Sequence, residues 1–295
     1  MSQAIQFDPI RLPDAAEDLR SEVRAFLADN AEHLDRPSRR GFDHEFARKV
    51  AAKGWIGLTW PKEYGGQERS FLERYVITEE FLVARAPSQV YFTADRQSGP
   101  VILKYGDEEL KRQVLPRIIA GECTFAIGMS EPDSGSDLFA AKAKAERTNE
   151  GWRLNGTKVW TTAAHEADYM IGLFRTSPAT KENRRHGLTQ FLVDMKKPGI
   201  QTRPILWPNG DHDFNEVVFE DVDLPANHLL GEEDNAWMQA TAELAYERSG
   251  PERFLETIAV LIDLVDDARH KIKYHDILSV EVREAEKNDP VTLEG

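Results

Sequence analysis

The residues with the clearest chemical potential lie between Cys123 and Asp137, in the segment CTFAIGMSEPDSGSD. Alternating apolar residues predict a strand over 123–129, which breaks at Pro132 into a turn. The turn offers hydroxyl groups and free backbone N–H groups, and Gly135 permits a close backbone approach. Such a turn suits a bound anion or the edge of a polar heterocycle. The alternative interpretation is a pair of helix-capping boxes, Ser130 with Asp133 and Ser134 with Asp137.

A second segment, Trp152–Thr162, reads WRLNGTKVWTT. Asn155-Gly156 between alternating residues predicts a β-hairpin. On their own, Trp160 and Thr162 would be ordinary strand residues, because strands are rich in both types. Together, SEPDSGSD and NGTKVWTT at this spacing resemble the acyl-CoA dehydrogenase family. The resemblance extends from about Asp14 to about Phe254.

The resemblance implies FAD as the cofactor, and α,β-dehydrogenation of an acyl-CoA thioester to the trans-2-enoyl-CoA as the reaction. A carboxylate removes the α-proton, and the flavin accepts the β-hydrogen as hydride, a step that no side chain can perform. Within the family's motifs, Ser130 stands where threonine is usual, Ser136 borders both the FAD pyrophosphate and the substrate's pantetheine arm, and Thr162 is placed to bond flavin N5. The implied cofactor-binding residues are Ile127, Met129, Ser130, Gly135, Ser136, Trp160 and Thr162.

The catalytic base is predicted from the segment LAYERSG, residues 244–250. Many family members place the base in the last third of a C-terminal helical bundle, a region that this chain lacks. Others, such as the isovaleryl- and long-chain-specific enzymes, place it on the first helix after the β-domain, directly before an arginine. Glu247-Arg248 matches that pattern, so Glu247 is the candidate base, with Tyr246 and Arg248 as substrate-binding residues. A glutamate sealed beside a flavin would have its pKa raised by desolvation.

Read from the residues alone, Glu247 is an exposed helical glutamate, and Glu243 one turn earlier is predicted to be another. Pro251 cannot donate a hydrogen bond to the carbonyl of Glu247, so the helix is expected to kink or end there.

The composition describes a globular protein and limits its partners. The chain has 295 residues, 41% of them hydrophobic, and a net charge of −14, which disfavours nucleic acid and anionic membranes. An anionic ligand such as coenzyme A would need local basic help, and the candidates are Lys142, Lys144, Arg147 and the loop 181–186. A single cysteine, Cys123, excludes an internal disulfide and is predicted to be a buried strand residue. We expect a cytoplasmic protein, because there is no apolar run long enough to cross a bilayer and no signal-peptide core.

Hydrophobic periodicity divides the chain into three blocks and predicts an α+β protein. We expect an N-terminal α-helical domain over 1–120, a middle β-sandwich or barrel domain over 121–231, and an incomplete C-terminal α-helical domain over 232–295. Pro116 is expected to end or bend the last helix of the first block. No Gly-x-Gly-x-x-Gly follows a strand, which argues against a Rossmann dinucleotide site. The predicted strands are 123–129, 140–147, 152–162, 168–175, 188–194, 200–206 and 214–220.

The C-terminal block is shorter than the resemblance requires. A four-helix bundle needs about 90–100 residues, whereas sixty follow Asn235. Phe254, Ile258, Leu261 and Val265 form an apolar stripe at helical spacing. Three explanations stay open: a shortened record of a longer protein, a natural subunit completed by a partner, and a chain that has lost catalysis.

The resemblance implies an oligomer that binds acyl-CoA and passes electrons to an electron-transfer flavoprotein. The alternative from another class is a non-catalytic or half-site subunit that binds acyl-CoA or a partner chain, which an exposed stripe at Phe254–Val265 would favour. An oxidase that reduces O₂ is a further alternative within the enzymes, because that choice depends on solvent access to the reduced flavin. Acyl length and branching stay open as well.

Overall fold

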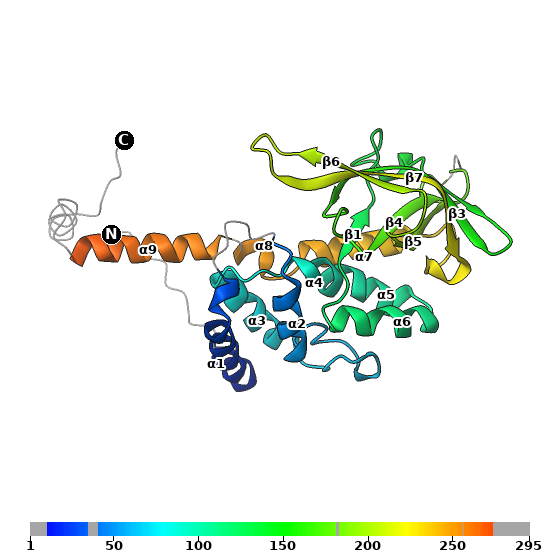
Figure 1. The fold of residues 1–295 in the computed structure, drawn as a ribbon. Helices are drawn as coiled ribbons and strands as arrows, with labels where there is room; N and C mark the ends of the chain where they lie inside the picture. The colour runs from blue at the N-terminus through cyan, green and yellow to red at the C-terminus, as the bar shows by residue number, and fades with distance from the viewer. Residues whose placement is uncertain (1–10, 35–40, 181–182, 256, 274–295) are drawn as a thin grey trace, which may run out of the picture.

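A layer of helices lies beneath a curved sheet, as Figure 1 shows. The computed structural model describes residues 11–34, 41–180, 183–255 and 257–273. Within these ranges no helix is long and apolar enough to traverse a membrane. The N-terminal helices are α1 Asp14–Asp29, α2 His44–Ala52, α3 Phe71–Val83, α4 Gln89–Thr93, α5 Gly99–Tyr105 and α6 Glu108–Ile119, with a π-helical turn, Ala94–Ser98, joining α4 to α5.

The helical layer forms where the sequence places apolar stripes. In α1, for example, Leu19, Val23 and Phe26 are buried, as the predicted stripe requires. A capping box begins α3, because Ser70 accepts from the backbone N–H of Glu73 while the Glu73 carboxylate accepts from that of Ser70. Pro116 does not end α6, which continues to Ile119 and closes with a bond from the Ala120 N–H to the Pro116 carbonyl.

The middle of the chain forms one eight-stranded sheet with the order β6-β7-β3-β2-β4-β5-β8, and β1 pairs with β4. Strands β1 and β4 run parallel, whereas β3 pairs antiparallel with β2 and β7. The strands are β1 Phe125–Gly128, β2 Lys144–Arg147, β3 Gly151–Thr162, β4 Tyr169–Arg175, β5 Leu188–Asp194, β6 Ile200–Leu206, β7 His212–Pro225 and β8 Leu229–Leu230.

The predicted hairpin at Asn155-Gly156 is wrong. Both halves of the segment pair with β7, as Leu154 with Val222 and Gly156 with Phe219, so the chain continues straight through as one strand with a bulge. The Asn155 side chain bonds the backbone and carboxylate of Asp221 at 2.9 and 3.0 Å. A glycine is needed because an added Cβ at residue 156 would lie 2.6 Å from the Ala143 Cα.

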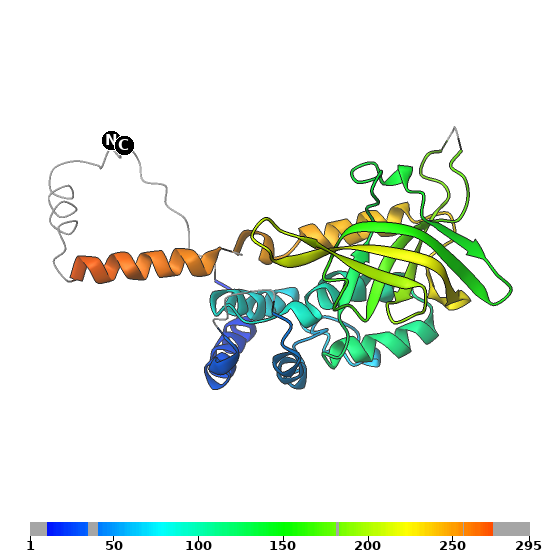
Figure 2. The same cartoon turned by 45° about the horizontal axis from the view of Figure 1, so that its top comes forward.

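After the sheet the chain becomes helical again. The helices are α7 Trp237–Arg248, α8 Glu252–Leu255 and α9 Ile258–Lys273. Helix α7 packs against α5, the π-helical turn and β5, while α9 projects away from the body in both views (Figures 1 and 2). The expected stripe does not lie on one helix, because Phe254 belongs to α8 and the other three residues to α9.

Candidate functional site

The turn after β1 is bonded to itself and to β3. Glu131 and Ser134 exchange two backbone hydrogen bonds at 2.7 and 3.0 Å, and the Ser134 hydroxyl donates to the Asp137 carbonyl at 2.7 Å. The capping-box interpretation is wrong, because the short 3₁₀ turn that follows has no side-chain cap. The Val159 N–H donates to the Ser130 carbonyl at 2.9 Å, which places the turn beside β3.

A buried ion pair between Lys158 and Glu131 holds the turn against β3. Lys158, which is 0% exposed, donates to Glu131 Oε1 at 2.8 Å and to the Met129 carbonyl at 3.2 Å. The same carboxylate accepts from the backbone N–H groups of Lys142 and Ala143 at 2.6 and 3.0 Å. Burial lowers the pKa of Lys158, and the Glu131 carboxylate opposes that shift. Because both charges have partners, the pair can hold the two segments together inside the protein.

The candidate cofactor residues of this pair of segments range from buried to exposed. Met129 is buried, Ser130 is partly buried, and Ser136 and Thr162 are exposed. Trp160 is 59% exposed and has a φ of 58°, and it contacts Phe214 edge-on at 5.9 Å. A large exposed aromatic ring at a strained φ is unusual for a strand and typical of a functional position. The remaining candidates are Ile127 and Gly135. Ile127 is partly buried in β1, and a Cβ added at Gly135 would meet no other atom within 4 Å.

Several predicted basic residues near the turn are engaged by acids. Lys142 pairs with Asp133 at 3.0 Å, and Arg184 pairs with Asp137 at 2.7 Å. Arg147 pairs with Glu233 at 2.5 Å. These pairs are exposed and individually weak, so an incoming phosphate could replace the carboxylates. Residues 181–182 of the predicted basic loop lie outside the described part of the chain.

Glu247 lies on the last turn of α7, and its carboxylate is paired. Arg253 donates to its Oε1 at 2.7 Å and to its backbone carbonyl at 2.9 Å. The helix ends at Arg248, and Gly250 with a φ of 98° precedes Pro251, so the predicted break is confirmed as an end. Tyr246 is partly buried against the helical core, and Arg248 is exposed.

The prediction that Glu243 is exposed is wrong. Its side chain is 1% exposed on the face of α7 that packs against β5, where Gln190 Nε2 donates to its Oε2 at 2.7 Å. The pKa of Glu243 is raised to about 8, chiefly by burial; the bond from Gln190 opposes this rise, and the charge of Glu247 adds to it. The other oxygens of this pair, Glu243 Oε1 and Gln190 Oε1, are buried without partners among the described residues. A protonated carboxyl can donate, so the neutral form suits these surroundings better than the carboxylate.

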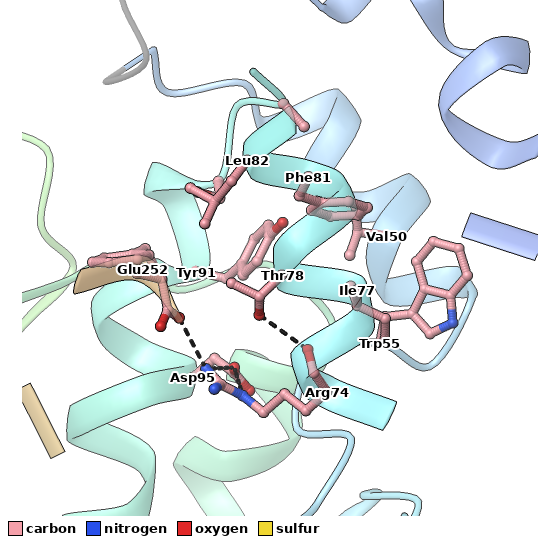
Figure 3. A pocket seen from close by; sticks show the side chains of 13 residues that line it. Val50, Trp55, Arg74, Ile77, Thr78, Phe81, Leu82, Tyr91, Asp95 and Glu252 are labelled. Carbon is pink, nitrogen blue, oxygen red and sulfur yellow. Dashed lines mark hydrogen bonds and ion pairs between the residues drawn. The ribbon is translucent and has the colours of Figure 1, made fainter. Parts of the chain in front are cut away.

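A pocket opens in the helical layer next to α8 (Figure 3). Apolar side chains form much of its wall, among them Trp55, Ile77, Phe81 and Leu82. Its polar part contains Arg74, which pairs with Asp95 at 3.1 Å and with Glu252 at 3.7 Å. The pocket therefore combines hydrocarbon surface with buried charge.

Sequence reasoning missed Lys158, Glu243 and the polar groups beside the pocket. A signal existed for Lys158, because strand alternation places it on the same face as Trp152 and Leu154, both buried. No comparable signal existed for Glu243, since a polar residue on a helix carries no hydrophobic periodicity. The prediction for Cys123 is confirmed: it is buried, and burial raises the pKa of its thiol to about 11.

Two family models match the chain: the acyl-CoA dehydrogenase N-terminal domain over residues 13–122, and the middle domain over residues 126–222. A curated relative, acyl-CoA dehydrogenase IpdE1 of Mycobacterium tuberculosis, is 36% identical over 244 residues, which are 79% of this chain and 63% of the relative. The chain spans less than two thirds of the length of such relatives, between 60% and 64% for four curated mycobacterial acyl-CoA dehydrogenases.

Solved structures give the same result. The Tcur3481-Tcur3483 steroid ACAD superposes with a TM-score of 0.79 at 31% identity, covering 91% of this chain and 70% of that chain. The ChsE4-ChsE5 complex from Mycobacterium tuberculosis superposes with a TM-score of 0.70 at 33% identity, covering 81% of this chain and 61% of that chain.

Proposed function

The chain belongs to the acyl-CoA dehydrogenase family, and on that premise we propose that it is an FAD-dependent dehydrogenase that converts an acyl-CoA thioester to the trans-2-enoyl-CoA. The observation that carries the proposal is the contact of the turn 130–137 with β3, fixed by Lys158 and Glu131. It places the hydroxyl-rich turn beside the strand that carries the exposed Trp160.

These residues fit a flavin. Trp160 offers an exposed aromatic ring, and the side chains of Ser130, Ser136 and Thr162 offer hydroxyl groups at accessible or partly accessible positions. Open space in front of Gly135 leaves room for a polar group to approach the backbone. When FAD is bound, its flavin supplies the hydride acceptor for the β-hydrogen.

The chain's own residues supply the proton chemistry and the positioning. Glu247 is the proposed base that takes the α-proton, with its Oε1 held by Arg253 at 2.7 Å. Removal of the proton leaves negative charge on the thioester oxygen, which hydrogen-bond donors must stabilise. In the proposal, Ser136, Tyr246 and Arg248 contact the substrate, and the electrons leave through an electron-transfer flavoprotein.

The test is a visible spectrum of the purified protein, followed by anaerobic addition of a panel of acyl-CoAs. A yellow protein that is bleached by one member of the panel supports the proposal. A protein that binds no flavin, alone or with a second subunit, contradicts it.

Glu247→Gln should keep the flavin spectrum and slow bleaching by about 10²–10⁴-fold, the usual contribution of a general base. Glu220→Gln, at an exposed position on β7, is the matched control and should bleach normally. Normal bleaching by Glu247→Gln would remove Glu247 as the base.

A second candidate is a half-site subunit completed by another chain. The exposed apolar residues of α9, including Val260 at 57%, Leu261 at 58% and Leu264 at 64%, favour it. Helix α9 is tied to the helical layer by an ion pair between Asp263 and Arg85, and an apolar partner surface would cover its remaining face. Under this proposal the purified chain is colourless and acquires FAD when it is co-expressed with a second acyl-CoA dehydrogenase subunit.

A further inference from the structure

Buried polar atoms that lack hydrogen-bond partners are concentrated on the segment 91–98 and on α7 and α8. Five of the ten such side-chain atoms in the described residues belong to these elements, and α7 packs against the π-helical turn of the segment. They are Tyr91 Oη, Arg96 Nε, Ser98 Oγ, Glu243 Oε1 and Glu252 Oε2. Buried polar atoms are normally bonded, so a cluster of exceptions indicates a place that a ligand or ordered water completes.

Arg96 is the most unusual member of this cluster. Its side chain is 7% exposed, and among the described residues it makes no ion pair or hydrogen bond, although it stacks 4.4 Å from the centre of the Phe92 ring. The nearby Arg74 is a useful contrast, because it pairs with both Asp95 and Glu252. Removing one partner of a buried charge is strongly destabilising. A buried guanidinium without a carboxylate therefore lowers the stability of the folded protein.

The charges around Arg96 come from each element that packs against it. Burial lowers its pKa, the carboxylates of Glu252 and Glu247 raise it, and Arg253 and Arg74 lower it. Arg96 is therefore close enough to Glu247 for the two charges to interact. Arg96 itself belongs to the π-helical turn Ala94–Ser98, and π-helical turns are frequent at functional sites.

We propose that Arg96, with the Tyr91 hydroxyl, binds an oxygen substituent, a keto group or a carboxylate, on the acyl part of the substrate. The inference deepens the proposed function and rests on it. A guanidinium and a phenol are donors, so they suit an acceptor oxygen. Tyr91 lines the pocket (Figure 3) together with Phe92, on which Arg96 stacks, and the pocket's apolar wall suits the hydrocarbon that carries this oxygen. The substrate class is therefore an oxygen-bearing acyl-CoA rather than a plain fatty acyl-CoA.

The first test compares three acyl-CoAs that share one carbon skeleton and carry at the far end no oxygen, a keto group or a carboxylate. Binding is measured by titration calorimetry on the FAD-loaded protein. The wild-type protein should bind one of the oxygenated compounds about 10- to 100-fold more tightly than the plain one, the value of a hydrogen bond to a charged group. Arg96→Met should abolish this preference and Arg96→Lys should keep part of it. The preferred compound identifies the substituent.

The second test is the stability of the ligand-free protein. Because Arg96→Met removes an unpaired buried cation, its unfolding midpoint in urea should equal or exceed that of the wild-type protein. A structural arginine predicts the opposite, so a large loss of stability or a failure to fold would overturn the proposal.

The outcomes separate this proposal from the function on which it rests. Equal affinity for all three compounds, or a preference that survives Arg96→Met, overturns the role of Arg96, while bleaching of the flavin by the plain compound still supports the dehydrogenase. In that case the buried polar atoms around Arg96 are satisfied by ordered water and not by the substrate. If no acyl-CoA binds or bleaches the protein, both proposals fail.

Discussion

Two regions of the molecule bury charged side chains, and they treat them differently. Beneath the turn 130–137, Lys158 and Glu131 satisfy each other, and the carboxylate accepts two further backbone N–H groups. In the helical layer, by contrast, Arg96 has no carboxylate partner, and on the face of α7 that packs against β5, Glu243 is held by the neutral amide of Gln190.

The difference distinguishes buried charges that hold the fold together from buried charges that are available to a ligand. A fully satisfied polar network specifies one arrangement of its segments and gains nothing from a ligand. A partly satisfied one lowers stability and persists where function uses it. We therefore propose that the Lys158 network holds the proposed flavin residues, and that Arg96 belongs to the part that meets the substrate. The predictions that follow test this assignment.

The largest effect is expected at the satisfied pair. Lys158→Met leaves Glu131 as a buried carboxylate without its cation, and this should lower the free energy of unfolding by about 3–5 kcal/mol. The measurement is urea denaturation followed by circular dichroism. The double variant Lys158→Met/Glu131→Gln should recover part of the loss, because glutamine is uncharged and still offers an oxygen to the backbone N–H groups of Lys142 and Ala143. A loss below about 1 kcal/mol in the single variant would place this pair among ordinary surface bridges.

A smaller and pH-dependent effect is expected at Glu243. Its pKa is raised to about 8 in the folded protein from the ordinary value of 4.5. Below the unfolded pKa both states are protonated and the group costs nothing. As the pH rises from there towards 8, unfolding releases a proton and stability falls. Between pH 5 and pH 7 this group alone should lower the free energy of unfolding by roughly 2 kcal/mol.

Glu243→Gln is the matched variant, because it removes the titration and keeps a side chain of similar shape. Its free energy of unfolding should change less between pH 5 and pH 7 than that of the wild-type protein, and the difference between the two profiles isolates Glu243 from all other groups. Parallel pH profiles of the free energy of unfolding would mean that Glu243 is ionised in the folded state. Glu243 would then no longer support the contrast between the two regions.

Local patterns in the sequence were sufficient for most of the fold. The strands 188–194 and 200–206 begin and end where predicted, because alternation and turn residues bound them on both sides. Asn155-Gly156 misled because the local hairpin signal is the same whether the flanking segments pair with each other or with a third strand. Only the pairing of β3 with β7, seventy residues away for Arg153 and Asp223, decides between them.

The site was predictable to a smaller extent. Motif resemblance located the turn and Trp160, which the structure brings to neighbouring segments through the bond between Val159 and Ser130. It could not reveal Arg96 or Glu243, because their importance lies in burial without a full set of partners. That property depends on how helices from opposite ends of the chain pack, and no local spacing encodes it.

The smallest effect on stability is expected at Trp160, which lies beside the satisfied Lys158 network but is proposed to act in ligand binding. It lies on the segment that Lys158 anchors, yet it is 59% exposed and has a φ of 58°, a conformation that costs a non-glycine residue about 1 kcal/mol or more. Trp160→Gly removes that strain and also the edge contact with Phe214, so the free energy of unfolding should change by less than about 1 kcal/mol.

The same substitution should weaken FAD binding at least tenfold, measured by fluorescence titration of the protein with FAD. Trp207→Gly is the control, since Trp207 also contacts Phe214, at 5.3 Å, and is 41% exposed but has no proposed part in cofactor binding. If Trp160→Gly unfolds the protein, the residue is architectural and belongs with Lys158. If it leaves FAD affinity unchanged, the strained backbone at this position has another cause and the flavin lies elsewhere.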